Sequence, residues 1–386
     1  MDVKSLDKEY IASTYNRFPV EIVGGNGAEV IDSENKKYID LGSGIAVNTF
    51  GLCDKEWINA VSEQLNKFQH TSNLYYHYPC AKLAEMLCER TELKKVFFSN
   101  SGAEANETAI KAARKYGAEI SKKSPVIITL ENSFHGRTLT TLAATGQEVF
   151  HKDFLPLTDG FVSVPANDLF TLLVAVKKHN PCAVMLEIVQ GEGGVNTLNK
   201  EYLLEVYSLC QREDILLICD EVQTGNGRTG ELYGFMNFDI MPDVVTTAKG
   251  LGGGLPIGAT MLGEKVMDIF TPGSNGSTFG GNPVVCAGAI SILERLNKEF
   301  LDTVKEKSKY IFDELSNADG ILSVSGLGLM IGVETKKPAA EVLAKCRENG
   351  VLVLTAKNKI RLLPPLNITK EQLEFSINVI KKACKE

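Results

Sequence analysis

The middle of the chain alternates short apolar segments with amphipathic helical segments, and this alternation restricts the fold more than any other feature. Five apolar, partly β-branched segments bounded by turn or polar residues read as strands: residues 96–99, 126–130, 183–187, 215–219 and 244–247. Residues 103–116 and 201–212 read as helices between them. Strands that alternate with helices predict an α/β fold, with a mainly parallel sheet covered on both faces.

The pattern changes after Pro283. Helices are predicted at residues 284–297, 302–315 and 370–382, and short strands at residues 322–324, 330–333 and 351–354. We therefore predict two domains: a large one of residues 49–282, and a smaller α+β domain formed by residues 1–48 and 283–386.

Charge and cysteine usage narrow the range of partners. With a net charge of −7, the chain lacks the basic surface that nucleic acids require. Its nine cysteines include no CxxC pair, so we expect free thiols in a reducing compartment and no metal site. Five charged residues among positions 2–9 leave no room for a signal-peptide core, and the apolar runs are too short to span a membrane. These features predict a cytoplasmic protein that binds small molecules and neither nucleic acid nor membranes.

Ligands of parallel sheets bind beyond the carboxyl ends of the strands, so the residues that follow strands are the first candidates for chemistry. Ser101 and Gly102 lie between the first predicted strand and a helix, where free N–H groups and the helix dipole favour an anion. Phe134 and Arg137 follow the second strand, and such a pair can stack on a planar ring and bind a carboxylate.

Two further candidates follow later strands. Asp220 comes directly after an apolar strand, where a carboxylate is costly unless it is paired with a cation or a metal. Lys249 precedes the glycine-rich turn 250–254, which gives an amine room to reach a carbonyl group. Each of these features, taken singly, also has an ordinary structural explanation. The alternatives are a helix cap for Ser101, a core Phe with a surface Arg for Phe134 and Arg137, an exposed loop acid for Asp220 and a solvated loop lysine for Lys249.

Two nucleotide-binding interpretations fail on context. The apolar strand before Asp220 resembles a Walker B strand, but the chain contains no Gly-Lys pair and hence no Walker A motif. Residues 225–230 spell GxGxxG, but no long amphipathic helix follows, as a dinucleotide fold requires.

A pyridoxal phosphate site needs all four of these parts together: an anion site at the start of a helix, an aromatic ring that stacks, a buried carboxylate and a lysine at the end of a strand. Seven segments of the chain match the motifs of one known family, and they occur in the order in which that family has them. They are SGAEANE from Ser101, FHGR from Phe134, QGEGG from Gln190, DEVQTGNGRTG from Asp220, AKGLGGGLPIGA from Ala248, GSTFGGNP from Gly276 and IRLLPPLNIT from Ile360. On these segments the chain resembles the class-III (ω-amino) aminotransferases of fold type I, from Gly24 to its last predicted helix. The resemblance implies a seven-stranded, mainly parallel sheet and pyridoxal 5'-phosphate bound in the large domain.

The resemblance also implies roles toward the cofactor. It implies Ser101, Gly102 and Ala103 at the phosphate, Phe134 stacked on the ring, Asp220 at the ring nitrogen, Val222 and Gln223 along the ring, and Lys249 as the catalytic lysine. It implies that Thr278 reaches the phosphate of a neighbouring subunit, so that a homodimer shares its active sites.

Four residues are implied to contact the substrates. Arg137 would bind the α-carboxylate, Ser277 would touch the substrate, Arg361 would bind the carboxylate next to the reacting carbon of glutamate, and Glu192 would neutralise Arg361 when that carboxylate is absent. The expected reaction transfers the δ-amino group of N-acetylornithine to 2-oxoglutarate, giving N-acetylglutamate semialdehyde and glutamate. Ornithine, succinylornithine, 4-aminobutyrate and N-succinyl-diaminopimelate stay open as alternative donors. An intramolecular aminomutase and a catalytically silent binding protein are less favoured, because Arg361, Lys249 and Asp220 are all present.

Overall fold

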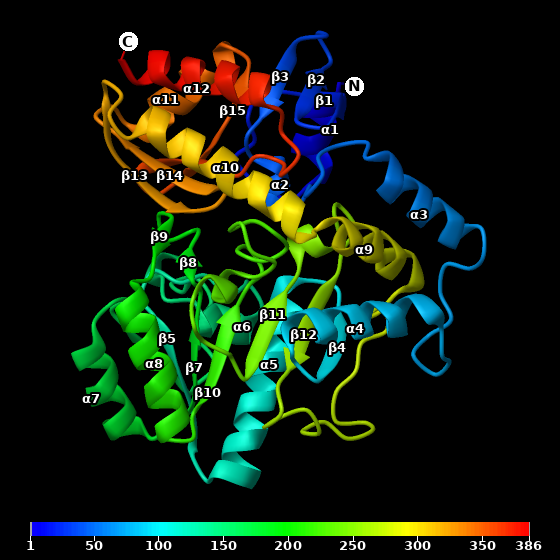
Figure 1. Ribbon diagram of the computed structural model, residues 1–386, viewed down its shortest axis with the longest axis vertical. Helices are drawn as coiled ribbons and strands as arrows, with labels where there is room; N and C mark the ends of the chain where they lie inside the picture. The colour runs from blue at the N-terminus through cyan, green and yellow to red at the C-terminus, as the bar shows by residue number, and fades with distance from the viewer. Residues whose placement is uncertain (1, 386) are drawn as a thin grey trace.

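The computed structural model describes residues 2–385, with a seven-stranded sheet at its centre (Figure 1). In spatial order the strands are β4 (Lys95–Ser99), β12 (Gly258–Leu262), β11 (Val244–Thr247), β10 (Leu216–Asp220), β7 (Pro181–Leu186), β5 (Ser124–Leu130) and β6 (Phe161–Val164). Within this sheet β12 runs antiparallel to both neighbours, and the other neighbouring pairs are parallel. The predicted fold class is confirmed.

Helices cover both faces of the sheet because successive residues of a buried strand point to opposite sides. On β10, Ile218 belongs to the apolar cluster formed with α5 (Gly102–Tyr116). Its neighbour Leu217 belongs to the cluster that includes α7 (Leu169–His179) and α8 (Lys200–Arg212). This burial on two sides explains why the strand sequences are continuously apolar rather than alternating.

The C-terminal part of the chain forms a second layered unit that lies above the large sheet in Figure 1. One sheet has the order β13 (Ile321–Leu327), β14 (Met330–Thr335), β17 (Lys359–Leu362) and β16 (Leu354–Ala356). A second has the order β1 (Ile22–Asn26), β2 (Glu29–Asp32), β3 (Lys37–Asp40) and β15 (Val351–Leu352). The parallel pairing of β3 with β15 joins the N-terminal segment to this unit. The domain boundaries at residues 48/49 and 282/283 stay a prediction.

The remaining elements connect or flank these sheets. The helices are α1 (Val3–Tyr10), α2 (Ser43–Ala46), α3 (Lys55–Leu65), α4 (Tyr78–Thr91), α6 (Leu139–Ala144), α9 (Pro283–Arg295), α10 (Lys298–Leu315), α11 (Ala339–Glu348) and α12 (Lys370–Lys385). A two-stranded hairpin is formed by β8 (Val189–Gln190) and β9 (Asn196–Thr197). Within residues 2–385, each helix is too short or too polar to cross a membrane.

The predicted strands and helices of the large sheet lie within two residues of the observed ones, but two predictions fall short. The predicted strand 351–354 is in fact two strands, β15 and β16, which belong to different sheets. Strands β6 and β12 of the large sheet were not predicted, and β12 begins with small residues of low strand propensity. A Cβ at Gly258 would lie 2.2 Å from the carbonyl oxygen of Ser101, so its lack of a side chain is required for packing.

Candidate active site

A cavity of about 440 Å³ opens where the carboxyl ends of the parallel strands meet. Nine residues that the sequence predicted line it: Ser101, Gly102, Ala103, Phe134, Arg137, Asp220, Val222, Gln223 and Lys249. They come from four segments that are far apart in sequence, and the parallel topology places the ends of their strands at one edge of the sheet. The structure therefore brings together the predicted cofactor residues other than Thr278.

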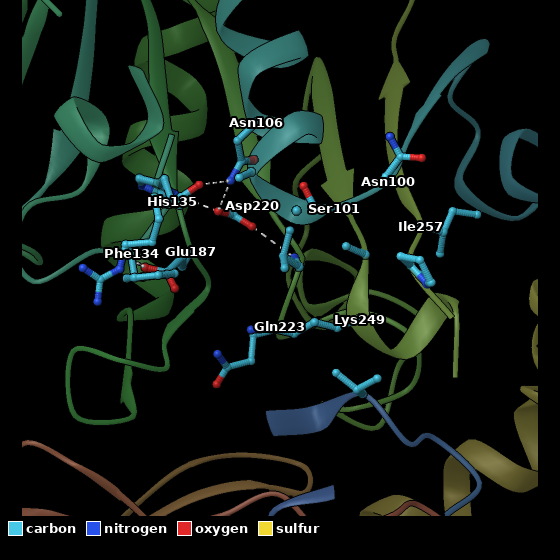
Figure 2. Close-up of a pocket in the computed structure, with 18 of the residues that line it drawn as sticks. Asn100, Ser101, Asn106, Phe134, His135, Glu187, Asp220, Gln223, Lys249 and Ile257 are labelled. Carbon is cyan, nitrogen blue, oxygen red and sulfur yellow. Dashed lines mark hydrogen bonds and ion pairs between the residues drawn. The ribbon is translucent and has the colours of Figure 1, made fainter. Parts of the chain in front are cut away.

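Asp220 is the last residue of β10, and its side chain is buried. Three donors converge on the carboxylate: His135 Nδ1 at 2.8 Å, Asn106 Nδ2 at 2.8 Å and the Val222 amide at 3.1 Å. Figure 2 shows the side chains of Asn106 and His135 directed at Asp220. A buried carboxylate is tolerated when it is hydrogen-bonded in this way, and here its position is fixed from several sides.

The sequence interpretation missed His135 and Asn106. Asn106 is itself held in place, because its Oδ1 accepts from Thr246 at 2.6 Å while its Nδ2 also donates to the His135 carbonyl oxygen at 2.7 Å. A signal was available for both residues. His135 stands inside the predicted motif 134–137, and Asn106 lies one helical turn after Gly102.

Lys249 follows β11 and begins a short 3-10 helix, Lys249–Leu251. Its backbone has a φ of +43°, an uncommon conformation for a residue with a side chain. Burial lowers the pKa of its ammonium group, with smaller effects from the charged groups around it. A lowered pKa raises the fraction of neutral amine, which is the nucleophilic and basic form.

The first turn of α5 offers a site for an anion. Ser101 is the N-cap residue, and its hydroxyl accepts from the Glu104 amide at 3.2 Å. The first amides of a helix have no acceptor within the helix, so those of Gly102 and Ala103 are available at the cavity wall. A Cβ at Gly102 would lie 2.7 Å from the nearest side-chain atom of Val222, so glycine is required at this position.

Phe134 and Arg137 line another part of the cavity, and Phe150 packs against both of them. Phe134 packs edge-on against Phe150, with ring centroids 6.0 Å apart. The exposed guanidinium of Arg137 lies over Phe150, 3.9 Å from its centroid, and 5.7 Å from that of Phe134. The charge of Arg137 is thus held at the rim, where it can meet a carboxylate.

Glu187 is a cavity residue to which the sequence gave no role. It directly follows β7 and accepts from the Phe134 amide at 3.0 Å, which ties Phe134 to the sheet. Burial, reinforced by the nearby charge of Asp220, raises the pKa of Glu187 well above its ordinary value. This shift favours the neutral form of the carboxyl group. The sequence placed residue 187 inside a strand, which concealed its position at the cavity.

Glu192 and Arg361 form an ion pair, with Arg361 Nη1 2.6 Å from Glu192 Oε1. The same nitrogen lies 3.3 Å from Gln223 Oε1, which connects the pair to the main cavity. Although burial acts to raise the pKa of Glu192, the Arg361 guanidinium holds it below its ordinary value. Among residues 2–385, Arg361 Nε has no hydrogen-bond partner, so this buried guanidinium retains a free donor.

Ser277 and Thr278 lie outside the main cavity of their own chain. They line a separate cavity of about 370 Å³. Ser277 Oγ accepts from the side chain of Asn100 at 3.3 Å and from the Gly280 amide at 3.0 Å, and Thr278 is exposed. The expected contact of Ser277 with substrate is therefore not seen within one chain. A role of Thr278 in a neighbouring subunit stays a prediction.

Comparisons with known proteins agree on one family. A family model described as aminotransferase class-III matches residues 10–384. The acetylornithine aminotransferase of Haemophilus ducreyi is 50% identical over 387 aligned positions, which cover 100% of this chain and 98% of that protein. Among solved structures, ornithine aminotransferase from Toxoplasma gondii gives a TM-score of 0.94 at 32% identity, covering 99% of this chain and 94% of that one. N-acetylornithine aminotransferase from Stenotrophomonas maltophilia gives 0.84 at 36% identity, covering 98% and 97%.

Proposed function

Because the chain belongs to the class-III aminotransferases, we propose that it transfers the δ-amino group of N-acetylornithine to 2-oxoglutarate, giving N-acetylglutamate semialdehyde and glutamate. The observation that carries this proposal is the Glu192–Arg361 ion pair beside the cavity, with one guanidinium donor still free. The 50% identity to an acetylornithine aminotransferase supports the choice of donor. The reaction would serve arginine synthesis.

The cavity fits pyridoxal 5'-phosphate in each of its parts. When bound, this cofactor supplies an electron sink for the negative charge that develops at the reacting carbon of the substrate. Gly102 and Ala103 would donate to its phosphate, Phe134 would stack on its ring, and Asp220 would pair with its ring nitrogen. Val222 and Gln223 would lie along the ring.

Lys249 and Asp220 carry the chemistry in this proposal. Lys249 would hold the cofactor through Nζ and, once free, move a proton at the reacting carbon of the substrate. Its lowered pKa favours the neutral amine that this task requires. Asp220, held by His135 and Asn106, would keep the ring nitrogen protonated. Arg137, exposed at the rim, would bind the α-carboxylate of N-acetylornithine.

The Glu192–Arg361 pair explains how one site can accept two unlike amino donors. The reacting carbon of N-acetylornithine bears no carboxylate, so Glu192 would stay paired and neutralise Arg361. The reacting carbon of glutamate bears one, which would displace Glu192 and form a bidentate contact with the guanidinium. We refer to these two residues as the gate.

The cytoplasm is the proposed location. All nine cysteines, which lie between residues 53 and 384, are free thiols, as expected of proteins kept in a reducing compartment.

A homodimer with shared active sites is the proposed assembly. Leu74, which is 86% exposed, and Tyr76 form an apolar surface with Phe279 of the loop that carries Thr278. Asn73 Nδ2 donates to the carbonyl oxygens of Ser277 at 2.9 Å and Gly280 at 3.0 Å, which binds the two segments together. Exposed apolar surfaces of this kind mark protein interfaces.

Sedimentation should give a dimer, and Tyr76→Glu should yield monomers that lose cofactor. A fully active monomer would contradict the shared site.

A panel of donors tests the proposed reaction. Initial rates with 2-oxoglutarate should give the highest kcat/KM for N-acetylornithine. Free ornithine is a second candidate, which the likeness to the ornithine aminotransferase structure favours. Succinylornithine, 4-aminobutyrate and N-succinyl-diaminopimelate complete the panel. A higher kcat/KM for any of these four donors would overturn the assignment of N-acetylornithine.

A further inference from the structure

The turn that carries Glu192 has an unusual backbone. It connects β8 to β9 through residues 191–195, and Val195 has a φ of +54°. This conformation is strained for a β-branched residue, so surrounding contacts must hold it. Gly191 is also confined, because a Cβ there would lie 2.3 Å from Gln223 Oε1 and 2.6 Å from Met330 Cε.

Two side chains of the C-terminal sheet hold this turn. Ser325 of β13 donates its hydroxyl hydrogen to the carbonyl oxygen of Val195 at 2.8 Å. Lys359 of β17 donates to Ser325 Oγ at 2.8 Å and to Asn196 Oδ1 at 3.2 Å. Asn196 in turn donates to the Gly193 carbonyl oxygen at 3.0 Å, which closes the turn. Figure 1 shows the β8–β9 hairpin directly against β13 and β14.

The same face of the C-terminal sheet carries both the gate arginine and this attachment. Lys359 and Arg361 are two residues apart on β17, so their side chains point to the same side. Gly332 pairs with Arg361 on the neighbouring strand. A Cβ at Gly332 would lie 2.8 Å from Val195 Cβ and 3.1 Å from Lys359 Cδ, so the turn fits closely over this face.

We propose that Ser325 and Lys359 are positioning residues that keep Glu192 in register with Arg361, and thereby set the preference for ω-amino donors over glutamate. This inference rests on the proposed function. Neither residue lines the main cavity, and both would act only through the backbone and side chains of residues 193–196. When either contact is removed, Glu192 should neutralise Arg361 less of the time, which leaves the guanidinium open to a carboxylate.

Single variants test the first consequence. In Ser325→Ala and Lys359→Met, the ratio of kcat/KM for glutamate to kcat/KM for N-acetylornithine should rise about two- to tenfold, the range expected for one lost hydrogen bond. The change should lie in KM, with kcat nearly unchanged, because Lys249 and Asp220 are untouched. Lys359→Arg, which keeps a cationic donor, should restore most of the preference.

The chain offers a matched control on the same strand. Ser323 is two residues from Ser325 on β13, but its hydroxyl bonds to Glu334 within its own sheet, at 2.9 Å. Ser323→Ala should leave the ratio unchanged. Hydrogen exchange of the holoenzyme gives a readout besides activity: the amides of residues 189–197 should exchange faster in Ser325→Ala and Lys359→Met than in Ser323→Ala.

A double-mutant cycle with Glu192→Ala separates a positioning role from general loosening. If Ser325 acts through Glu192, then Ser325→Ala should add no further change to the ratio in the Glu192→Ala background. If the amides of residues 189–197 exchange faster in Ser325→Ala and Lys359→Met but the kcat/KM ratio is unchanged, the proposal is overturned. The two residues would then only attach the turn to the sheet. If Glu192→Ala shifts the ratio but Ser325→Ala and Lys359→Met do not, the inference fails while the gate stands. If Glu192→Ala has no effect, the gate itself fails, and this inference with it.

Discussion

Two acidic residues of the candidate site, Asp220 in the cavity and Glu192 beside it, are held in different ways. Asp220 is 3% exposed and receives hydrogen bonds from His135, Asn106 and the backbone. Glu192 keeps 29% of its side-chain surface exposed, and its principal partner is Arg361. The first carboxylate can move only if several hydrogen bonds break, whereas the second can exchange its partner for a substrate carboxylate.

This difference separates a fixed part of the site from an adjustable part. The fixed part stands on the ends of β10 and β11 and on the first turn of α5, which are all packed in the core. The adjustable part stands between the two units of the molecule, on the β8–β9 turn and on β17. Catalysis needs preorganised charges, and the use of two donors needs a partner that can leave.

Loss of Lys249 should have the largest effect. Lys249→Ala should reduce turnover by at least about a thousandfold, because the amine is both the cofactor attachment and the proton carrier. Steady-state rates measure the loss. Lys265→Ala is the matched control, since it removes a partly buried lysine that pairs with Asp243 outside the cavity. Substantial multiple turnover by Lys249→Ala would refute the assigned role.

Asp220→Asn should cost activity by about two or more orders of magnitude, with little loss of fold. An amide cannot neutralise a protonated ring nitrogen, and breaking a buried pair typically costs about 3–5 kcal/mol. Asp243→Asn is the control, because Asp243 is also a buried acid, directly before β11, and accepts from the Leu217 amide at 2.9 Å. Near wild-type rates for Asp220→Asn would show that the fixed part of the site lies elsewhere.

Glu187→Gln should have the smallest effect on activity, because burial raises the pKa of this carboxyl group and an amide resembles the neutral acid. Above the ordinary pKa of 4.5, the folded state retains a proton that the unfolded state has lost. The stability of the wild type should therefore fall as pH rises, by up to about 1.4 kcal/mol per pH unit from this group. Glu187→Gln should lack this contribution to the pH dependence of the free energy of unfolding. Denaturant titrations of both proteins between pH 5 and about pH 8 measure that dependence. If the free energies of unfolding of the two proteins change in parallel with pH, the raised pKa of Glu187 is contradicted.

The sequence predicted the parts of the site that directly follow strands. Asp220 and Lys249 could be found because the carboxyl ends of parallel strands meet at one edge of a sheet. The motifs pointed to the segments that carry His135 and Asn106, but not to their role, since their contacts with Asp220 depend on how the 131–137 loop and α5 pack over β10. Ser325 and Lys359 were beyond reach for the same reason, as they lie on a different sheet from the turn that they hold.

Single-turnover spectra of the two half-reactions test the gate most directly, because the aldehyde and amine forms of the cofactor absorb differently. Arg361→Ala should slow the reaction with glutamate by about 10- to 150-fold, the cost of a charge-assisted contact, and should change the reaction with N-acetylornithine far less. Glu192→Ala should do the reverse, since an unpaired Arg361 attracts carboxylates and disfavours a donor that lacks one at its reacting carbon. Equal losses in both half-reactions for both variants would contradict the gate and leave Glu192 and Arg361 as structural residues.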